Sequence, residues 1–180
     1  MEHADHVALL RDGVPGGGTW ADLGSGQGAF TLALAGLLGG SGTIYSVDRD
    51  AAALRAQQQA MSSRFPGITA HYLTADFAKP LDLPPLDGVL MANALHFVRE
   101  KSGVLQMVGG YLKQGGRLVL VEYNADQGNP WVPYPLSYPT WEALARRSGF
   151  EHTRRLATTP SRFLKEIYSA LSFKPEGPAA

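Results

Sequence analysis

The sequence contains no cysteine among its 180 residues. Disulfide bonds, thiolate zinc sites and cysteine nucleophiles are therefore excluded together. It also has no apolar run near the ~20 residues that a membrane-spanning helix needs. The first residues, 1–6, lack the basic and apolar regions of a signal peptide. We therefore expect a cytoplasmic protein with no membrane partner.

Neither sign of charge is in excess, because 16 lysines and arginines balance 16 aspartates and glutamates. A neutral chain has no general attraction for nucleic acid, and we expect no such partner. Histidines and carboxylates do not cluster with the spacing of metal ligands, so we expect no metal site. The length predicts a single domain over residues 1–173, followed by a disordered tail, 174–180, that is rich in proline, glycine and alanine.

Three glycines at alternate positions, Gly24, Gly26 and Gly28, stand between a strand-like segment and the helix-like segment 31–38. Glycine lets a chain bend sharply and lets a ligand approach the exposed backbone N–H groups, which indicates a nucleotide-type cradle. The third glycine comes one residue too early for a dinucleotide fingerprint. Asp22, two residues before the first glycine, would repel a phosphate, although a plain Rossmann interpretation stays open.

Further polar side chains follow later strand-like segments. The segment 43–48 ends in Asp48, which follows Gly24 by 24 residues, near the ~20 expected of an acid that binds ribose hydroxyls. Arg49 could lay its methylene stem on a base, and Asp50 is a candidate cap for a helix over 51–63. A helix cap or a surface acid is the alternative role for Asp48.

The next two segments carry an acid–aromatic pair and an amide. Segment 69–77 ends in Asp76-Phe77, and segment 86–93 ends in Asn93 with His96 just beyond it. Histidine is the side chain that exchanges a proton near neutral pH, so His96 is a candidate base, with a structural role as the alternative.

Taken in order, these segments resemble motifs I to IV of the class I S-adenosylmethionine-dependent methyltransferases. The resemblance begins with Asp-x-Gly-x-Gly-x-Gly. It includes Leu112-Lys-x-Gly-Gly-x-Leu-x-Leu-Val-Glu122, which runs into the predicted fifth strand over 117–123. It implies an α/β fold: a doubly wound, mostly parallel seven-stranded sheet in the order 3-2-1-4-5-7-6, with strand 7 antiparallel and helices on both faces. The residues that it implies for cofactor binding are Asp22, Leu23, Gly24, Ser25, Gly26, Gly28, Asp48, Arg49, Asp76, Phe77 and Asn93.

The resemblance also implies the reaction, a direct methyl transfer from S-adenosylmethionine to an O, N or C nucleophile of a small molecule. His96, Tyr123 and Glu122 are the candidate catalytic residues, since all three follow or end strands near the expected methyl group. The fourth motif is not the Asp/Asn-Pro-Pro-Tyr/Phe type that acts on exocyclic base amines. A protein or RNA acceptor, a nicotinamide-dependent oxidoreductase and a non-catalytic nucleotide-binding module are the alternatives.

The segment 124–141 contains four prolines, two tryptophans and two tyrosines. The prolines preclude a long helix or a central strand, and the aromatics make the segment too apolar for a solvated linker. We predict a rigid wall of the substrate site that favours an aromatic or apolar acceptor; a loop that only packs over the core is the alternative. We also predict helices over 3–12, 98–111 and 141–148, the last capped by Thr140, and two closing antiparallel strands over 150–161 and 163–173. The leader before the first strand is too short for a lid.

Overall fold

The structure, a computed structural model, describes residues 1–177 and contains one seven-stranded sheet. The strand order is β3-β2-β1-β4-β5-β7-β6, which confirms the predicted topology. Strand β7 runs antiparallel to both of its neighbours, and the other pairs are parallel. The strands are β1 (Thr19–Leu23), β2 (Thr43–Asp48), β3 (Thr69–Thr74), β4 (Leu86–Ala92), β5 (Leu112–Tyr123), β6 (Glu151–Ser161) and β7 (Lys165–Phe173).

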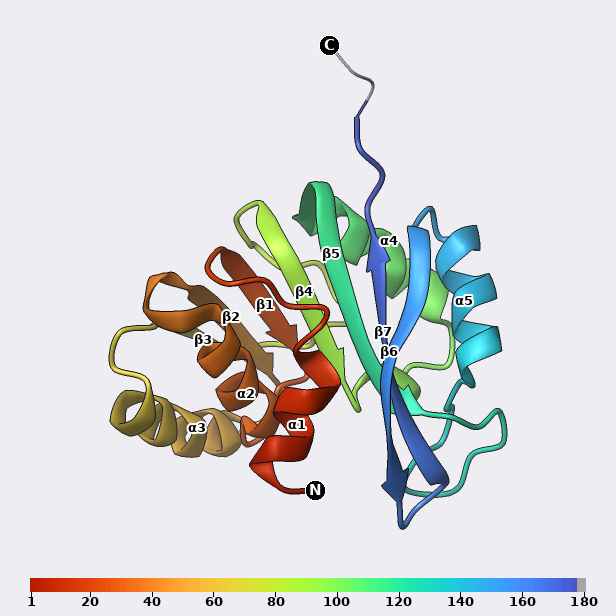
Figure 1. Ribbon diagram of the computed structural model, residues 1–180, viewed down its shortest axis with the longest axis horizontal. Helices are drawn as coiled ribbons and strands as arrows, with labels where there is room; N and C mark the ends of the chain where they lie inside the picture. The colour runs from red at the N-terminus through yellow and green to blue at the C-terminus, as the bar shows by residue number, and fades with distance from the viewer. Residues whose placement is uncertain (178–180) are drawn as a thin grey trace.

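Helices cover both faces of the sheet (Figure 1). Residues of α1 (His3–Leu10), α2 (Ala29–Leu38) and α3 (Ala51–Arg64) share one apolar core, while those of α4 (Lys101–Tyr111) and α5 (Tyr138–Arg147) share the core on the other face. Two short 3-10 turns, η1 (Gly39–Ser41) and η2 (Leu95–Phe97), complete the elements, and residues 75–85 connect β3 to β4 without a helix. None of the helices within residues 1–177 is long and apolar enough to cross a bilayer.

The register brings the carboxyl ends of the parallel strands to one edge of the sheet. Leu23 pairs with Val47, and Asp48 pairs with Thr74. Ala92 at the end of β4 pairs with Val121 near the end of β5. Ligands bind at this edge in open α/β sheets, and the predicted site residues follow these strand ends.

The N-terminus and the turn between β6 and β7 lie at the same edge of the molecule, as Figure 1 shows, while residues 174–177, which follow β7, leave from the opposite edge. Helix α1 packs on α2, and the His6 ring meets the Phe30 ring edge-on with centroids 4.5 Å apart. Burial lowers the pKa of His6. The neutral ring therefore serves as an apolar contact that fixes α1 beside the strand ends.

Some predicted boundaries differ from the observed ones. Strand β5 begins at Leu112 rather than at residue 117, because Leu112 pairs with Leu86 across a bulge. Ser137, not Thr140, caps α5, and its side chain accepts a hydrogen bond from the Thr140 N–H. The expected tail from residue 174 is described only to Gly177: it has no helix or strand, and Lys174 N–H donates to the Gly116 carbonyl at 2.8 Å. The remaining expectation, for 178–180, lies outside the described residues.

Candidate active site

The glycine turn joins β1 to α2 and is held against the end of β2. The N–H groups of Gly24 and Ser25 donate to the Val47 carbonyl at 2.8 and 3.1 Å. Gly24 has a φ of +81°, and a Cβ built there would lie 2.6 Å from the Ala94 Cβ. Only glycine allows the backbone to run this close to the segment after β4.

The two acids that follow β2 and β3 are oriented by nearby backbone N–H groups. Asp48 Oδ2 accepts from Gly26 N–H at 2.7 Å, and its Oδ1 accepts from Asp50 N–H at 2.8 Å. Asp76 Oδ1 accepts from Ala78 N–H at 3.0 Å. Each carboxylate oxygen has a second lone pair, so both acids keep the capacity to bind hydroxyl or amine donors of a ligand.

A cavity of about 290 Å³ lies along these strand ends. It is lined by six residues predicted for cofactor binding, together with four residues that the sequence reasoning missed. Phe97 is the missed residue with a sequence signal, since it is an aromatic beside His96 just after a buried strand. The ten lining residues are Gly24, Asp48, Arg49, Asp76, Phe77, Ala78, Asn93, Ala94, Phe97 and Val98.

Asn93 occupies the strand end at the centre of the sheet with a φ of +51°, a left-handed conformation that asparagine tolerates better than most residues. Its N–H donates to the Val121 carbonyl at 2.8 Å. Its buried side-chain oxygen Oδ1 has no hydrogen-bond partner within residues 1–177. A buried acceptor without a partner is costly, so this oxygen is suited to an N–H donor of a ligand.

Asp22 lies beneath the glycine turn and does not line the cavity. It is 1 % exposed, and its Oδ2 accepts a hydrogen bond from the Thr31 hydroxyl at 2.6 Å. Thr31 in turn accepts from the Gln57 amide, and Gln57 Oε1 accepts from the Ser46 hydroxyl at 2.7 Å. This buried network was not predicted, because its four members come from four separate elements, β1, α2, β2 and α3. Leu23 is also buried, and Ser25, Gly26 and Gly28 lie on the turn outside the cavity lining. Direct cofactor contact by these five residues stays a prediction.

Burial raises the pKa of Asp22 to about 7, against the lowering effect of the Thr31 hydrogen bond. Between the ordinary aspartate pKa near 4 and about 7, the folded protein therefore holds more protons than the unfolded chain. The free energy of unfolding falls as the pH rises through this window. At pH 8, ionised Asp22 destabilises the folded state.

We therefore expect Asp22→Asn to stabilise the protein at pH 8 and to lose this advantage at pH 4. The amide keeps an acceptor for Thr31 and carries no charge to bury. Urea unfolding at the two pH values measures the difference from the wild type. Asp82→Asn, an exposed control, should change stability at neither pH. A urea midpoint of Asp22→Asn equal to that of the wild type at pH 8 would contradict the raised pKa of Asp22.

The three candidate catalytic residues lie together. His96 Nδ1 is 2.9 Å from Glu122 Oε2, and the His96 N–H donates to Glu122 Oε1 at 3.0 Å. The His96 ring contacts the rings of Phe97 and Tyr123, with centroids 4.3 and 5.6 Å apart. Glu122 is fully buried and contacts His96 through its carboxylate, so its predicted role as a direct base stays a prediction. A carboxylate at Nδ1 favours the tautomer whose free nitrogen is Nε2.

A second cavity, of about 520 Å³, shares Asn93 with the first. Its walls come from the N-terminal segment, the end of β5 and the turn between β6 and β7. The N-terminal leader was expected to be too short to cover the site, but its first residues line this cavity. The lining residues are Met1, Glu2, Asp5, Asn93, Tyr123, Thr159, Pro160, Ser161, Arg162, Phe163 and Ile167.

The aromatic segment 124–141 contributes no residue to either of these two cavities. The segment is therefore not a wall of either cavity, contrary to its predicted role in the substrate site. Trp141 belongs to α5 and is buried in the core, whereas Trp131 is 71 % exposed. The segment instead supports the turn that holds His96, because Tyr134 N–H donates to the His96 carbonyl at 3.0 Å. The alternative, a loop that packs over the core, fits better.

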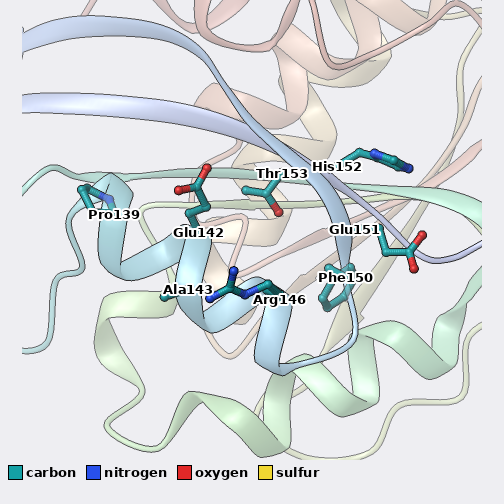
Figure 2. A pocket seen from close by; sticks show the side chains of 8 residues that line it. All are labelled: Pro139, Glu142, Ala143, Arg146, Phe150, Glu151, His152 and Thr153. Carbon is teal, nitrogen blue, oxygen red and sulfur yellow. The ribbon is translucent and has the colours of Figure 1, made fainter.

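A further cavity, of about 560 Å³, lies between α5 and the start of β6. Figure 2 shows its walls, with Glu142 and Arg146 from the helix and Thr153 from the strand. Glu151 at its rim pairs with Phe173, which pairs with Arg117 far from the strand ends that carry Asp48 and Asn93. None of the predicted site residues lines it.

Comparison with solved structures gives the same fold. The YcgJ protein from Bacillus subtilis matches with a TM-score of 0.76 and 13% identity, over 97% of this chain and 100% of that one. The 1,6-didemethyltoxoflavin-N1-methyltransferase of Burkholderia thailandensis, solved with bound 1,6-didemethyltoxoflavin and S-adenosylhomocysteine, matches with a TM-score of 0.73 and 16% identity, over 97% of this chain and 78% of that one. An S-adenosylmethionine-dependent methyltransferase from Methanosarcina mazei gives 0.72 and 16%, over 94% and 98%.

At the sequence level, no curated protein matches this chain. A family model, however, described as a methyltransferase domain, matches residues 16–169. That range runs from before β1 into β7 and includes both acids, Asn93 and the His96–Glu122 pair. The chain therefore belongs to the methyltransferase domain family and has the fold of the S-adenosylmethionine-dependent methyltransferases compared above.

Proposed function

We propose that the protein transfers the methyl group of S-adenosylmethionine to an oxygen, nitrogen or carbon nucleophile of a small molecule. The observation that carries the proposal is the position of Asn93, which lines both the cavity of about 290 Å³ and the cavity of about 520 Å³. A donor in the first and an acceptor in the second would meet at this residue, beside the ring of His96.

The residues of the first cavity fit this cofactor. Asp48 would accept hydrogen bonds from the ribose hydroxyls, Asp76 from the exocyclic adenine amine, and Phe77 would pack on the adenine ring. The unpartnered Oδ1 of Asn93 suits the ammonium group of the methionine portion. When bound, the cofactor supplies a methyl group on a positively charged sulfur and needs no metal to activate it. The protein's part is to orient the acceptor and to exclude water.

His96 and Glu122 would add proton transfer. Glu122, held by the N–H groups of His96 and Tyr123, keeps the imidazole oriented through Nδ1. Within residues 1–177 no hydrogen bond reaches Nε2, so this nitrogen can take a proton from the acceptor. Tyr123 faces the second cavity, and burial together with Glu122 raises its pKa. We therefore assign Tyr123 to acceptor packing and leave the base role to His96.

The cofactor site is tested by calorimetric titration with S-adenosylmethionine, S-adenosylhomocysteine and NAD. We expect both adenosyl ligands to bind and NAD to fail, because the third glycine, Gly28, comes one residue too early for the turn that binds a pyrophosphate. Asp48→Ala should weaken S-adenosylhomocysteine at least 10-fold, since it removes hydrogen bonds to a charged group worth about 1.5–3 kcal/mol each. Asp76→Ala should weaken it by a similar factor for the same reason.

Asp82→Ala provides the matched control, because Asp82 is an exposed aspartate outside the cavity. Its affinity for S-adenosylhomocysteine should equal that of the wild type. Binding of NAD alone, or equal affinities for Asp48→Ala and Asp82→Ala, would rule out the proposed site.

A further inference from the structure

We propose that the second cavity binds the methyl acceptor, and that this acceptor is a planar aromatic molecule without negative charge that carries an ionisable O–H or N–H group. The inference rests on the proposed function, because it takes the first cavity as the cofactor site. It names the class of acceptor and assigns its binding to Tyr123 and to the turn between β6 and β7.

The location of the cavity supports a role in acceptor binding. It meets the cofactor cavity at Asn93. Its wall includes Tyr123, whose ring lies edge-on to the His96 ring with centroids 5.6 Å apart. A molecule held there would lie beside both the expected methyl group and the imidazole.

The apolar wall of the cavity favours a planar ring. Tyr123 and Phe163 meet edge-to-face with centroids 6.4 Å apart and an interplanar angle of 84°. Ile167 is buried behind them, whereas Phe163 leaves 61 % of its surface exposed. Exposed aromatic surface at a cavity mouth is covered when an apolar ligand binds, and aromatic rings pack well at these angles. A cavity of about 520 Å³ has room for a ligand of two or three fused rings.

The charged groups of the cavity balance one another. Glu2 and Asp5 contribute two carboxylates from the N-terminal segment, while the Arg162 guanidinium and the Met1 amino group contribute two positive charges. A carboxylate or phosphate on the acceptor would lose its hydration there without a net attraction in return. The polar groups that remain, such as Thr159 and Ser161, are neutral and suit the heteroatoms of an uncharged ring.

A base role for His96 implies an ionisable group on the acceptor. The acceptor's O–H or N–H bond breaks, its proton passes to Nε2 of His96, and the freed electron pair forms the new bond to the methyl carbon. The carbon–sulfur bond breaks at the same time, and its electron pair stays on sulfur. Glu122 stabilises the imidazolium that forms, and the proton leaves to water after the product departs.

The test uses 2-naphthol as a neutral planar probe and 2-naphthoate as its anionic counterpart. Each is titrated into protein saturated with S-adenosylhomocysteine, and binding is followed by calorimetry. We expect 2-naphthol to bind at least 10-fold more tightly than 2-naphthoate. Phe163→Ala should weaken 2-naphthol at least 10-fold and leave S-adenosylhomocysteine affinity unchanged, because Phe163 lines only the second cavity.

Trp131→Ala is the matched control, because Trp131 is also an exposed aromatic residue but lines neither cavity. It should bind 2-naphthol as the wild type does. No binding of 2-naphthol, tighter binding of 2-naphthoate, or equal weakening by the two variants would overturn the inference. Failure of S-adenosylhomocysteine to bind would refute the proposed function instead. If 2-naphthol then still bound in a way that depends on Phe163, the second cavity would be a site for neutral planar ligands, without a role in methyl transfer.

Discussion

Replacing His96 with glutamine is expected to slow methyl transfer by about 10²–10⁴, the usual contribution of a positioned general base. Glutamine is polar and of similar size but cannot take up the acceptor's proton. The variant should still bind S-adenosylhomocysteine like the wild type, because His96 does not line the cofactor cavity. The measurement is kcat with an acceptor found by screening planar phenols and N–H heteroaromatics, together with calorimetry of S-adenosylhomocysteine.

Two further variants define how His96 acts. Glu122→Gln keeps a carbonyl acceptor for His96 Nδ1 but removes the charge that stabilises the imidazolium, so we expect an intermediate loss in kcat with unchanged cofactor affinity. His71→Gln is the control, since His71 in β3 stacks on Tyr45 in β2 and lines neither cavity. A His96→Gln rate equal to that of His71→Gln would show that the reaction needs no base here.

The second large effect concerns stability at Gly28, where alanine is expected to lower the free energy of unfolding by about 3 kcal/mol. Gly28 caps α2 with a φ of +87°, a conformation that costs an L-residue about 1–2 kcal/mol. A Cβ there would lie 2.4 Å from Gln57, which is fixed by its bonds to Thr31 and Ser46. Displacing it adds about 1–3 kcal/mol of overpacking.

Gly26→Ala separates the two causes. Gly26 also has a positive φ, +54°, but a Cβ there meets no atom within 4 Å among the described residues. It should therefore lose only the conformational part, about 1 kcal/mol. Urea unfolding of both variants without ligand gives the comparison. Equal losses of stability in the two variants would mean that Gln57 moves away from the added Cβ of residue 28 without cost.

The first cavity was largely predictable from the sequence, for a physical reason. In a parallel sheet every strand delivers its last residues to one edge, so Asp48, Asp76 and Asn93 converge once their strands are recognised. Strand recognition needs only local apolar runs and glycine turns. The local pattern also sufficed for Asp50, whose side chain caps α3 through the N–H groups of Ala52 and Ala53.

The second cavity was not predictable in this way. Its walls depend on where an antiparallel hairpin turns and on how α1 packs against α2, and both follow from long-range contacts. The same holds for Gln57, whose partners Thr31 and Ser46 are distant in sequence. The cap of α5 was misplaced because Ser137 and Thr140 are both good capping residues, and only the position of the preceding loop selects Ser137.

The two cavities draw on different parts of the chain. The first is built from residues 24–98, whereas nine of the eleven residues around the second lie within 1–5 or 159–167, with only Asn93 and Tyr123 between them. Under the proposed assignment of donor and acceptor, insertions or substitutions near the chain start and in the β6–β7 turn would therefore alter which acceptor binds without touching the donor site. On that assignment the range of acceptors can change while the transfer reaction is kept, and grafting these two segments is a direct way to engineer it.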